Sequence, residues 1–365
     1  MYMNGEKYMN RLSFEKVFYH MDQLYDFHKK NDNYPVHFTI GLTSYCNHRC
    51  LFCYGDYETS NPNKNFSIQK DVLLTILKEA FECGLKSVSL VGTGEPLLHK
   101  NSAEIIEGIK SIGIEVAVYT NGVMVKGDIA EAILDCCTWV RVSCNAADVN
   151  EHNHIHQCKN DFKNIIDNFR NLISKKKKRG AQFPTIGCQF AAFQDNYLSM
   201  YDAAKLWKSV GIDYFAIKPV YKHPKNTNQK NNLLDYSKVE QLMEKTLSLQ
   251  DDSFIVYAKF DQFRDVLSTD YARSYKTCFG HAFSSVILAD GKMYLCGNLH
   301  SEERYCIGNI YNGDSFKDLW SSEKRKNVIK NIDVNVCPKR CRNDPLNNIL
   351  WDMKNPNLDI HPNFL

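Results

Sequence analysis

The chain has 365 residues, with 45 basic and 42 acidic side chains and a formal net charge of +3. This near balance argues against a dedicated nucleic-acid binder, whose domain usually carries a strongly basic face. A hydrophobic fraction of 44% is enough to bury a substantial core and excludes the disordered class.

The N-terminal segment lacks the apolar core of a signal peptide, and the chain has no uncharged apolar stretch long enough to span a bilayer. We therefore expect a cytoplasmic protein without a membrane partner. The sequence contains fourteen cysteines. In a reducing compartment, clustered cysteines are more often metal ligands or redox groups than structural disulfides. Residues 1–35 are predicted to form a helical extension.

From about residue 36, short β-branched segments alternate with amphipathic helical segments, a pattern typical of repeated βα units and a parallel sheet. The predicted strands are His37–Leu42, Lys86–Val91, Ile114–Tyr119, Thr138–Ser143, Pro184–Phe190 and Tyr214–Pro219. Six such units over residues 36–222 can form a partial barrel or an open doubly wound sheet, and the pattern alone does not choose. In either case, the chemistry is expected on loops at the carboxyl ends of the strands.

The second half of the chain does not continue the alternation of strands and helices. Residues 223–274 are predicted to be a linker and a helical connection. Residues 275–345 contain short strands, turns and cysteines, which predicts a small unit that relies on a metal for stability. Residues 346–365 form a C-terminal tail that we expect to cover either the second cysteine group or the barrel mouth.

Three cysteines follow the first predicted strand directly. Cys46, Cys50 and Cys53 have the spacing C-x3-C-x2-C. Three thiolates can hold three corners of a cubane iron–sulfur cluster, whereas structural zinc would need a fourth protein ligand that the local sequence does not supply. The iron left without a protein ligand could bind a substrate or cofactor directly.

This spacing after the first strand, with the aromatic Phe52 before the third cysteine, resembles the signature of the radical S-adenosylmethionine (SAM) superfamily. The resemblance implies an α/β fold, a partial (β/α)6 TIM-like barrel, and a 4Fe-4S cluster whose free iron chelates SAM. Electron transfer would cleave SAM to methionine and a 5′-deoxyadenosyl radical, which abstracts a hydrogen atom from the substrate. The electron would come from an external donor such as flavodoxin or ferredoxin.

Further segments match the family at the ends of later strands. Gly92-Thr93-Gly94-Glu95 resembles its GGEP segment, whose glycines let the backbone approach methionine and whose carboxylate accepts from the ammonium group. Thr93 replaces the commoner glycine. Thr120-Asn121-Gly122 resembles a frequent TNG segment. The implied cofactor-binding residues are Phe52, Gly92, Thr93, Gly94, Glu95, Asn121, Ser143, Asn145 and Gln189.

A second cysteine group lies near the C-terminus. Cys278 and Cys296 flank a predicted hairpin with Gly291 at its turn, and Cys337 and Cys341 follow. The pattern resembles the auxiliary-cluster domains called SPASM and, in a shorter form, twitch. These four cysteines are implied ligands of a second 4Fe-4S cluster. So few cysteines favour the twitch form with one auxiliary cluster, and the role of Cys306 stays open. A zinc knuckle held by the same four cysteines is the alternative.

The histidines His152, His154 and His156 alternate, but this position in the family is the entry to a helix, and we do not predict a metal site there. The basic run 175–179 is interpreted as the solvated end of a helix. Tyr54, Arg141 and Lys218 are candidates for a catalytic acid or base by position alone.

The sequence favours an oxidoreductase that abstracts hydrogen from a small hydroxylated substrate, a sugar or aminocyclitol, and passes an electron to the auxiliary cluster. This preference rests on the 35 residues before the first strand, which are too few for a leader-peptide recognition domain of the kind many peptide maturases carry. The alternatives are a peptide-modifying maturase that crosslinks or epimerises residues and a non-catalytic metal-binding module.

Overall fold

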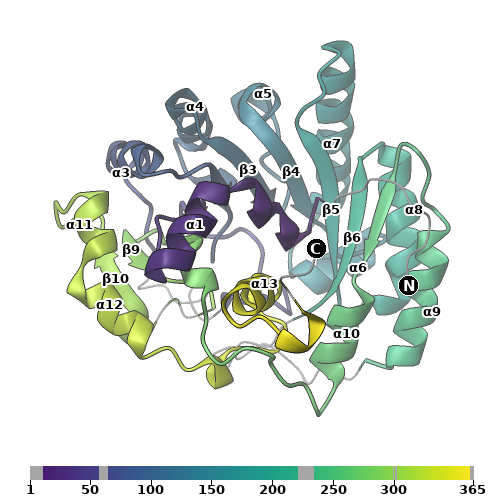
Figure 1. The fold of residues 1–365 in the computed structure, drawn as a ribbon. Helices are drawn as coiled ribbons and strands as arrows, with labels where there is room; N and C mark the ends of the chain where they lie inside the picture. Colours follow the sequence, from purple (N-terminus) through teal and green to yellow (C-terminus); the bar gives the residue numbers. More distant parts are fainter. Residues whose placement is uncertain (1–10, 57–64, 221–233, 299, 301, 362–365) are drawn as a thin grey trace.

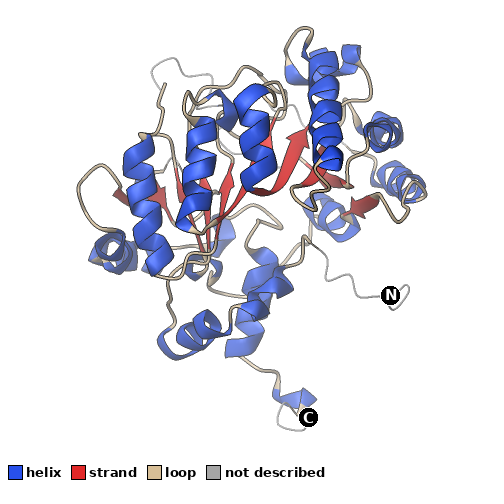
Figure 2. Cartoon of the chain, turned by 90° about the horizontal axis from the view of Figure 1, so that it is seen from above, coloured by secondary structure: helices blue, strands red, loops and turns tan. Residues whose placement is uncertain are grey.

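The computed structural model describes residues 11–56, 65–220, 234–298, 300 and 302–361. Most of the predicted polar linker, residues 221–233, lies outside this part of the chain. The centre is a ten-stranded sheet in the order β10-β9-β8-β1-β2-β3-β4-β5-β6-β7. The sheet is curved, with helices α3, α4, α5, α7, α8 and α9 around its outside and α1 and α13 on its concave side (Figure 1; Figure 2).

All six predicted strands are present and run parallel in chain order. They are β1 (His37–Ile40), β2 (Ser87–Leu90), β3 (Glu115–Thr120), β4 (Cys137–Ser143), β5 (Thr185–Ala192) and β6 (Tyr214–Pro219). A seventh parallel strand, β7 (Ile255–Ala258), pairs with β6 and was not predicted. The partial-barrel prediction is confirmed.

The α-helices of the described chain precede, separate and follow these strands, and most of them bury apolar side chains on one face. They are α1 (Met21–Lys30), α3 (Lys70–Glu82), α4 (Ser102–Ile112), α5 (Gly127–Cys136), α6 (Val149–His156), α7 (Asp161–Lys178), α8 (Met200–Val210), α9 (Tyr236–Leu247), α10 (Phe260–Leu267), α11 (Phe316–Ser321), α12 (Glu323–Lys330) and α13 (Asp344–Lys354). In α4, for example, Ile105, Ile106 and Ile109 are fully buried. This helix ends at Gly113, whose φ of 101° is the left-handed conformation that glycine adopts easily.

The C-terminal strands join the same sheet instead of building one of their own. The predicted hairpin is present as β8 (Ser284–Ile287) and β9 (Lys292–Tyr294), with Gly291 at φ 79° in its turn, and β10 (Cys306–Asn309) follows. β8 runs parallel to β1. Backbone hydrogen bonds from Val36 N to Phe283 O (3.0 Å) and from Gly41 N to Ile287 O (2.9 Å) close both ends of this pairing. β8 thereby covers an edge that β1 would otherwise expose.

The two faces of the parallel sheet differ in chemistry. Strand partners share a face, so the register defines an outer face that includes Phe38, Val88, Val118, Val140, Ile186 and Phe215, all buried in the main core. The opposite, inner face includes Thr39, Ser89, Tyr119, Arg141, Gln189, Lys218 and Tyr257. Parallel strands buried on both sides are usually apolar throughout. The polar inner face therefore indicates a surface kept for ligands.

Among the described residues, no helix combines the length and apolarity that a membrane span requires.

Candidate functional site

The first cysteine loop leaves β1 and is held by the end of helix α6. The backbone N–H groups of Arg49 and Leu51 donate to the carbonyl oxygens of His156 and Ile155, both at 3.0 Å. The last carbonyls of a helix lack partners within the helix and are free to accept such bonds. Because Arg49 and Leu51 flank Cys50, the chain on both sides of this cysteine is fixed by protein contacts.

The three predicted cluster cysteines converge. Burial raises the pKa of the Cys46 thiol to about 12, with further contributions from Glu95 and Cys53. Burial also raises the pKa of Cys50 well above its ordinary value, and Cys53 and Cys46 raise it further. These thiols would lose their protons only against a compensating positive charge, which a bound metal provides.

The spacing of these sulfur atoms bears on the kind of metal site. Four thiolates around one zinc ion at about 2.3 Å lie about 3.8 Å from one another. In the part of the chain that the structure describes, the groups whose ligand atoms all lie within 4.8 Å are His48–Cys50–His156 and His48–His152–Cys158, and Cys46–Cys50–Cys53 is not among them. The three cysteines therefore suit a polynuclear cluster better than a single ion.

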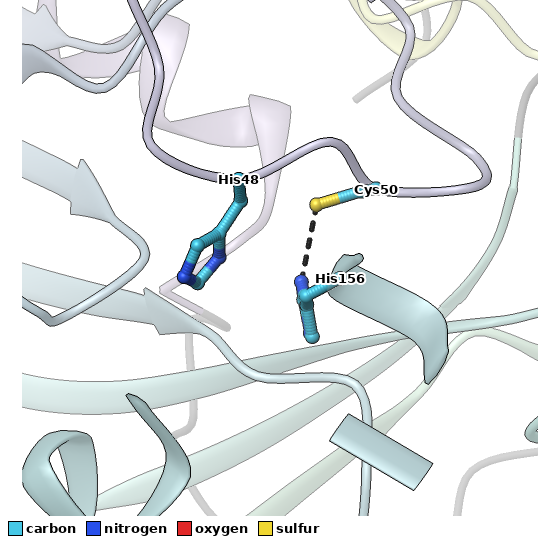
Figure 3. A group of neighbouring side chains, drawn as sticks. All are labelled: His48, Cys50 and His156. Atoms are coloured by element: carbon cyan, nitrogen blue, oxygen red, sulfur yellow. Dashed lines mark hydrogen bonds between the residues drawn. The ribbon is translucent and has the colours of Figure 1, made fainter. Parts of the chain in front are cut away.

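The structure places a histidine against one of these cysteines. His156 Nδ1 lies 3.1 Å from Cys50 Sγ (Figure 3). The backbone N–H of Asn145 donates to His156 Nε2 at 3.2 Å, so Nε2 carries no proton and Nδ1 is the donor to sulfur. His48, from the cysteine loop, is held by Asp161 at 3.1 Å. Hydrogen bonds to cluster sulfurs are one means of tuning a cluster's reduction potential.

The sequence interpretation of His152, His154 and His156 did not anticipate this contact. His152 and His156 are buried on one side of α6, whereas His154 is exposed and bonds Asp195 at 3.1 Å. The spacing of four residues between His152 and His156, which places both on one helix face, was the available signal. Nothing local indicated that this face meets the cysteine loop.

The predicted glycine-rich segment packs tightly under the cysteine loop. A Cβ atom at Gly94 would overlap the carbonyl oxygens of Thr43 and Tyr45 and lie 2.8 Å from the carbonyl carbon of Ser44. The backbone N–H of Glu95 donates to Tyr45 O at 2.9 Å, and this hydrogen bond holds the two backbone segments together. A Cβ at Gly92 would lie 2.8 Å from Gly41 Cα. Glycine is thus required here because two backbones touch.

We expect Gly94→Ala to lower the free energy of unfolding by roughly 1–3 kcal/mol, the cost of forcing extra atoms into a packed site. The clash is with backbone atoms, which cannot rotate away. Chemical denaturation of the variant measures the loss. Gly127→Ala is the matched control for added volume, because no atom lies within 4 Å of a Cβ there, although its φ of 55° adds some strain. Equal stability of Gly94→Ala and the parent would contradict the packing argument.

The carboxylate of Glu95 is buried and ordered by the predicted TNG segment. Its oxygens accept from Thr120 Oγ1 at 2.7 Å, from the Asn121 N–H at 2.7 Å and from the Leu97 N–H at 3.2 Å. Burial raises the pKa of the Glu95 carboxyl to about 7, and the three hydrogen bonds oppose this rise. A carboxylate held in this way is ready for a cationic partner.

The other predicted cofactor residues lie along the carboxyl-terminal edge of the sheet. Ser143 and Gln189 are partners in the β4–β5 register, and Gln189 Oε1 accepts from Arg141 Nη1 at 3.3 Å. Asn145 Oδ1 accepts from the Ala191 N–H at 2.6 Å, so this side chain ties the end of β4 to β5. Phe52 packs against Phe193, with ring centroids 5.2 Å apart. A SAM contact through each of these residues stays a prediction.

The second cysteine group is assembled from three segments. Cys278 and Cys337 both act on the Cys341 thiol, whose pKa burial raises to about 12. Burial also raises the pKa of Cys337 to about 11, and Cys278 raises it further. Arg273 Nη2 donates to the carbonyl oxygen of Cys337 at 2.8 Å, which anchors the loop. Cys278, Cys337 and Cys341 are therefore brought together.

Cys296 follows the hairpin strand β9 and packs half-buried against the main core, and its ligand role stays a prediction. Cys306 is a buried residue of β10 whose Sγ contacts Gly308 O at 3.2 Å. The C-terminal helix α13 covers the second group, because Asn347 Nδ2 lies 3.5 Å from Cys278 Sγ and Asn347 Oδ1 accepts from the Phe279 N–H at 2.7 Å. Asn347, near the start of the predicted tail, therefore contacts the second cysteine group.

Comparison with protein families decides what this arrangement is. Residues 40–188 match the family described as the radical SAM superfamily, and residues 278–343 match the SPASM iron–sulfur cluster-binding domain. The chain belongs to the radical SAM superfamily. Its cofactors are SAM and 4Fe-4S clusters, in line with the convergent cysteines of the two matched regions. Both the family and the fold expected from the cysteine spacing are confirmed.

Two kinds of sequence relative support this assignment. A probable GTP 3′,8-cyclase from Saccharolobus solfataricus is 39% identical over 88 residues, which is 24% of this chain and 27% of the cyclase. This chain therefore matches only about a quarter of the length of such relatives. The subtilosin biosynthesis protein AlbA from Bacillus subtilis is 22% identical over 293 residues, covering 79% of this chain and 60% of AlbA.

Solved structures agree in fold. SuiB from Streptococcus suis, bound to SAM, superposes with a TM-score of 0.66 at 15% identity, covering 89% of this chain and 76% of SuiB. The enzyme anSMEcpe with bound SAM gives 0.59 at 17% identity, covering 81% and 80%. The match to SuiB extends the likeness beyond the barrel, since residues 40–188 alone would not account for 89% of the chain.

Proposed function

We propose that this radical SAM enzyme modifies a peptide, the alternative that the sequence left open, and not a small hydroxylated molecule. The observation that carries the proposal is the likeness in fold to SuiB over nearly the whole chain, because SuiB has also been solved with its precursor peptide SuiA, at a TM-score of 0.65. AlbA, which acts in the biosynthesis of a bacteriocin, supports the same substrate class.

The proposed roles follow the two cysteine groups. Cys46, Cys50 and Cys53 would hold the first cluster. A reduced 4Fe-4S cluster bound there supplies the electron that cleaves SAM into methionine and the hydrogen-abstracting 5′-deoxyadenosyl radical. Glu95 would pair with the ammonium group of SAM. The N–H of His156 would donate to the Cys50 sulfur and the helix α6 carbonyls would hold its loop.

The second group would accept an electron from the peptide radical. Cys278, Cys337 and Cys341, with Cys296 as the proposed fourth ligand, have no position left open for SAM. Removal of a hydrogen atom and then of one electron and one proton oxidises the peptide by two electrons overall. The protein would need an external reductant of the flavodoxin or ferredoxin class to start each cycle.

A panel of short synthetic peptides and a panel of sugars and aminocyclitols provide the test. The chain is reconstituted anaerobically with iron and sulfide, reduced with dithionite and incubated with SAM and each compound. We expect 5′-deoxyadenosine together with a peptide that has lost two hydrogen atoms. Formation of 5′-deoxyadenosine that rises only with sugars or aminocyclitols would overturn the peptide assignment.

The raised pKa of Glu95 predicts how SAM binding depends on pH. Below a pKa of about 7 the carboxyl becomes protonated and can no longer pair with an ammonium group. We therefore expect SAM affinity to fall about tenfold per pH unit below pH 7 and to level off above it. Calorimetric titrations at pH 6 and pH 8 measure the difference. Glu95→Gln, which cannot ionise, is expected to bind weakly and equally at both; a parental pH dependence in this variant would refute the assignment.

A further inference from the structure

The inner face of the sheet carries a concentration of positive charge. Arg141 lies on β4 and Lys218 on β6, and the register places both on this face. Lys259 follows β7 directly, two residues after the inner-face Tyr257. Arg342 reaches the same face from the C-terminal region, where its Nη1 donates to Thr39 Oγ1 at 2.7 Å. These four cations from separate segments thus meet one surface, and Lys16, whose pKa is lowered by burial and by Arg141 and Arg342, lies close to them.

Arg141 shows how this charge is held. Its guanidinium is buried, with Nε donating to Tyr214 Oη at 2.9 Å and Nη1 donating to Gln189 Oε1 at 3.3 Å. The rings of Tyr119, Trp139 and Tyr214 surround it with centroids 4.9, 5.1 and 5.5 Å from Cζ. Aromatic faces favour a cation and fix the guanidinium plane, but none of these neighbours neutralises it.

The described strands place little negative charge on this surface. On the inner face of strands β1 to β7, Glu115 is the one acidic residue, and it lies at the exposed amino-terminal start of β3. No described residue forms a hydrogen bond or ion pair with the ammonium groups of Lys218 and Lys259. Buried charges in proteins are normally paired, so a cluster of this kind favours the binding of an anion.

The protonation equilibria agree with the geometry. Burial lowers the pKa of Lys218 to about 7, and Arg141, Lys259 and Arg342 lower it further. Burial lowers the pKa of Lys259 to about 8, with Arg141 again contributing. These mutual effects place the four groups near one another, and a bound anion would restore the charge of both lysines.

We propose that Arg141, Lys218 and Lys259 bind a carboxylate of the peptide substrate, an aspartate or glutamate side chain close to the residue that is modified. This inference rests on the proposed function and adds the charge of the substrate to it. The SAM carboxylate is a poorer match for the site, because Glu95, the proposed partner of the SAM ammonium group, follows β2, whereas Lys218 and Lys259 belong to β6 and the end of β7, with three strands between β2 and β6.

The test uses the reconstituted chain with SAM and two peptides of twelve residues, each labelled with an uncharged dye. The peptides differ only at two central positions, which are both glutamate in one peptide and both glutamine in the other. Fluorescence anisotropy measures their affinities. We expect the glutamate peptide to bind about tenfold more tightly, the effect of one charged hydrogen bond. Lys218→Met should reduce the difference to about twofold, and Lys218→Arg, which keeps the charge, should retain it.

Controls separate the possible outcomes. Lys178→Met, on helix α7 away from the inner face, should behave as the parent. Loss of SAM binding by Lys218→Met, measured by calorimetry without peptide, would overturn the inference by assigning the charge to SAM. Tighter binding of a phosphoserine peptide than of the glutamate peptide would overturn the carboxylate assignment. Equal binding of the two peptides by an enzyme that still modifies its precursor would overturn the inference and leave the proposed function standing.

Discussion

Replacing Cys50 with alanine is expected to abolish 5′-deoxyadenosine formation and to lower bound iron from about eight to about four atoms per chain. The sulfur of Cys50 has no substitute of its kind in the loop, since Cys46 and Cys53 would already hold two other corners of the cluster. The fold should survive, because the N–H groups of Arg49 and Leu51 keep their bonds to helix α6. Iron analysis and chromatography of the reaction products measure both effects.

Cys158→Ala is the matched control for this prediction. Cys158 is close enough to raise the pKa of Cys50, but it lies outside the C-x3-C-x2-C spacing. We expect this variant to keep full iron content and SAM cleavage. If Cys158→Ala loses the cluster and Cys50→Ala retains it, the group His48–His152–Cys158 holds a metal and the assignment of the first loop is wrong.

Replacing Cys278 with alanine is expected to separate SAM cleavage from the proposed peptide modification. SAM cleavage should persist, because the first cysteine loop is unchanged. Peptide product should fall by about a hundredfold or more, because the peptide radical would lose its electron acceptor. Bound iron should again fall to about four atoms per chain. Peptide mass spectrometry and 5′-deoxyadenosine measured in the same reaction give the ratio.

Cys306→Ala is the control in the C-terminal region, because this cysteine packs inside β10 beside Gly308. It should change stability slightly and leave the iron content intact. Peptide modification at the parental rate by Cys278→Ala, with the first cluster still assembled, would show that the second group is not needed as an electron acceptor.

The barrel could be predicted from sequence because its signals are local. The apolar residues of α4 and the glycine that ends this helix lie within a dozen consecutive residues. Each parallel strand lies between two such helices in the chain. The pairing of β8 with β1 could not be predicted in this way. It joins residues nearly 250 positions apart, and the alternation of a four-residue strand does not specify its neighbour.

In the candidate site, too, the features with a local sequence pattern could be predicted and the long-range contacts could not. The spacing of Cys46, Cys50 and Cys53 is a local pattern, and it led directly to the family. The contact between His156 and Cys50 depends on how α6 ends under the loop, 106 residues away in sequence. The positive inner face is likewise invisible in a net charge of +3, because it arises from the register of separate strands.

The parallel pairing of β1 and β8 also sets how the two cysteine groups are separated along the sheet. The first cysteine loop follows the carboxyl end of β1, whereas Cys278 precedes the amino end of β8, beside Val36. The length of a four-residue strand, about 13 Å, therefore lies between the two groups before their loops are counted. A peptide on the inner face would be positioned between them. Its hydrogen atom would leave at one end of the sheet and its electron at the other. This separation would hinder direct electron transfer between the two clusters.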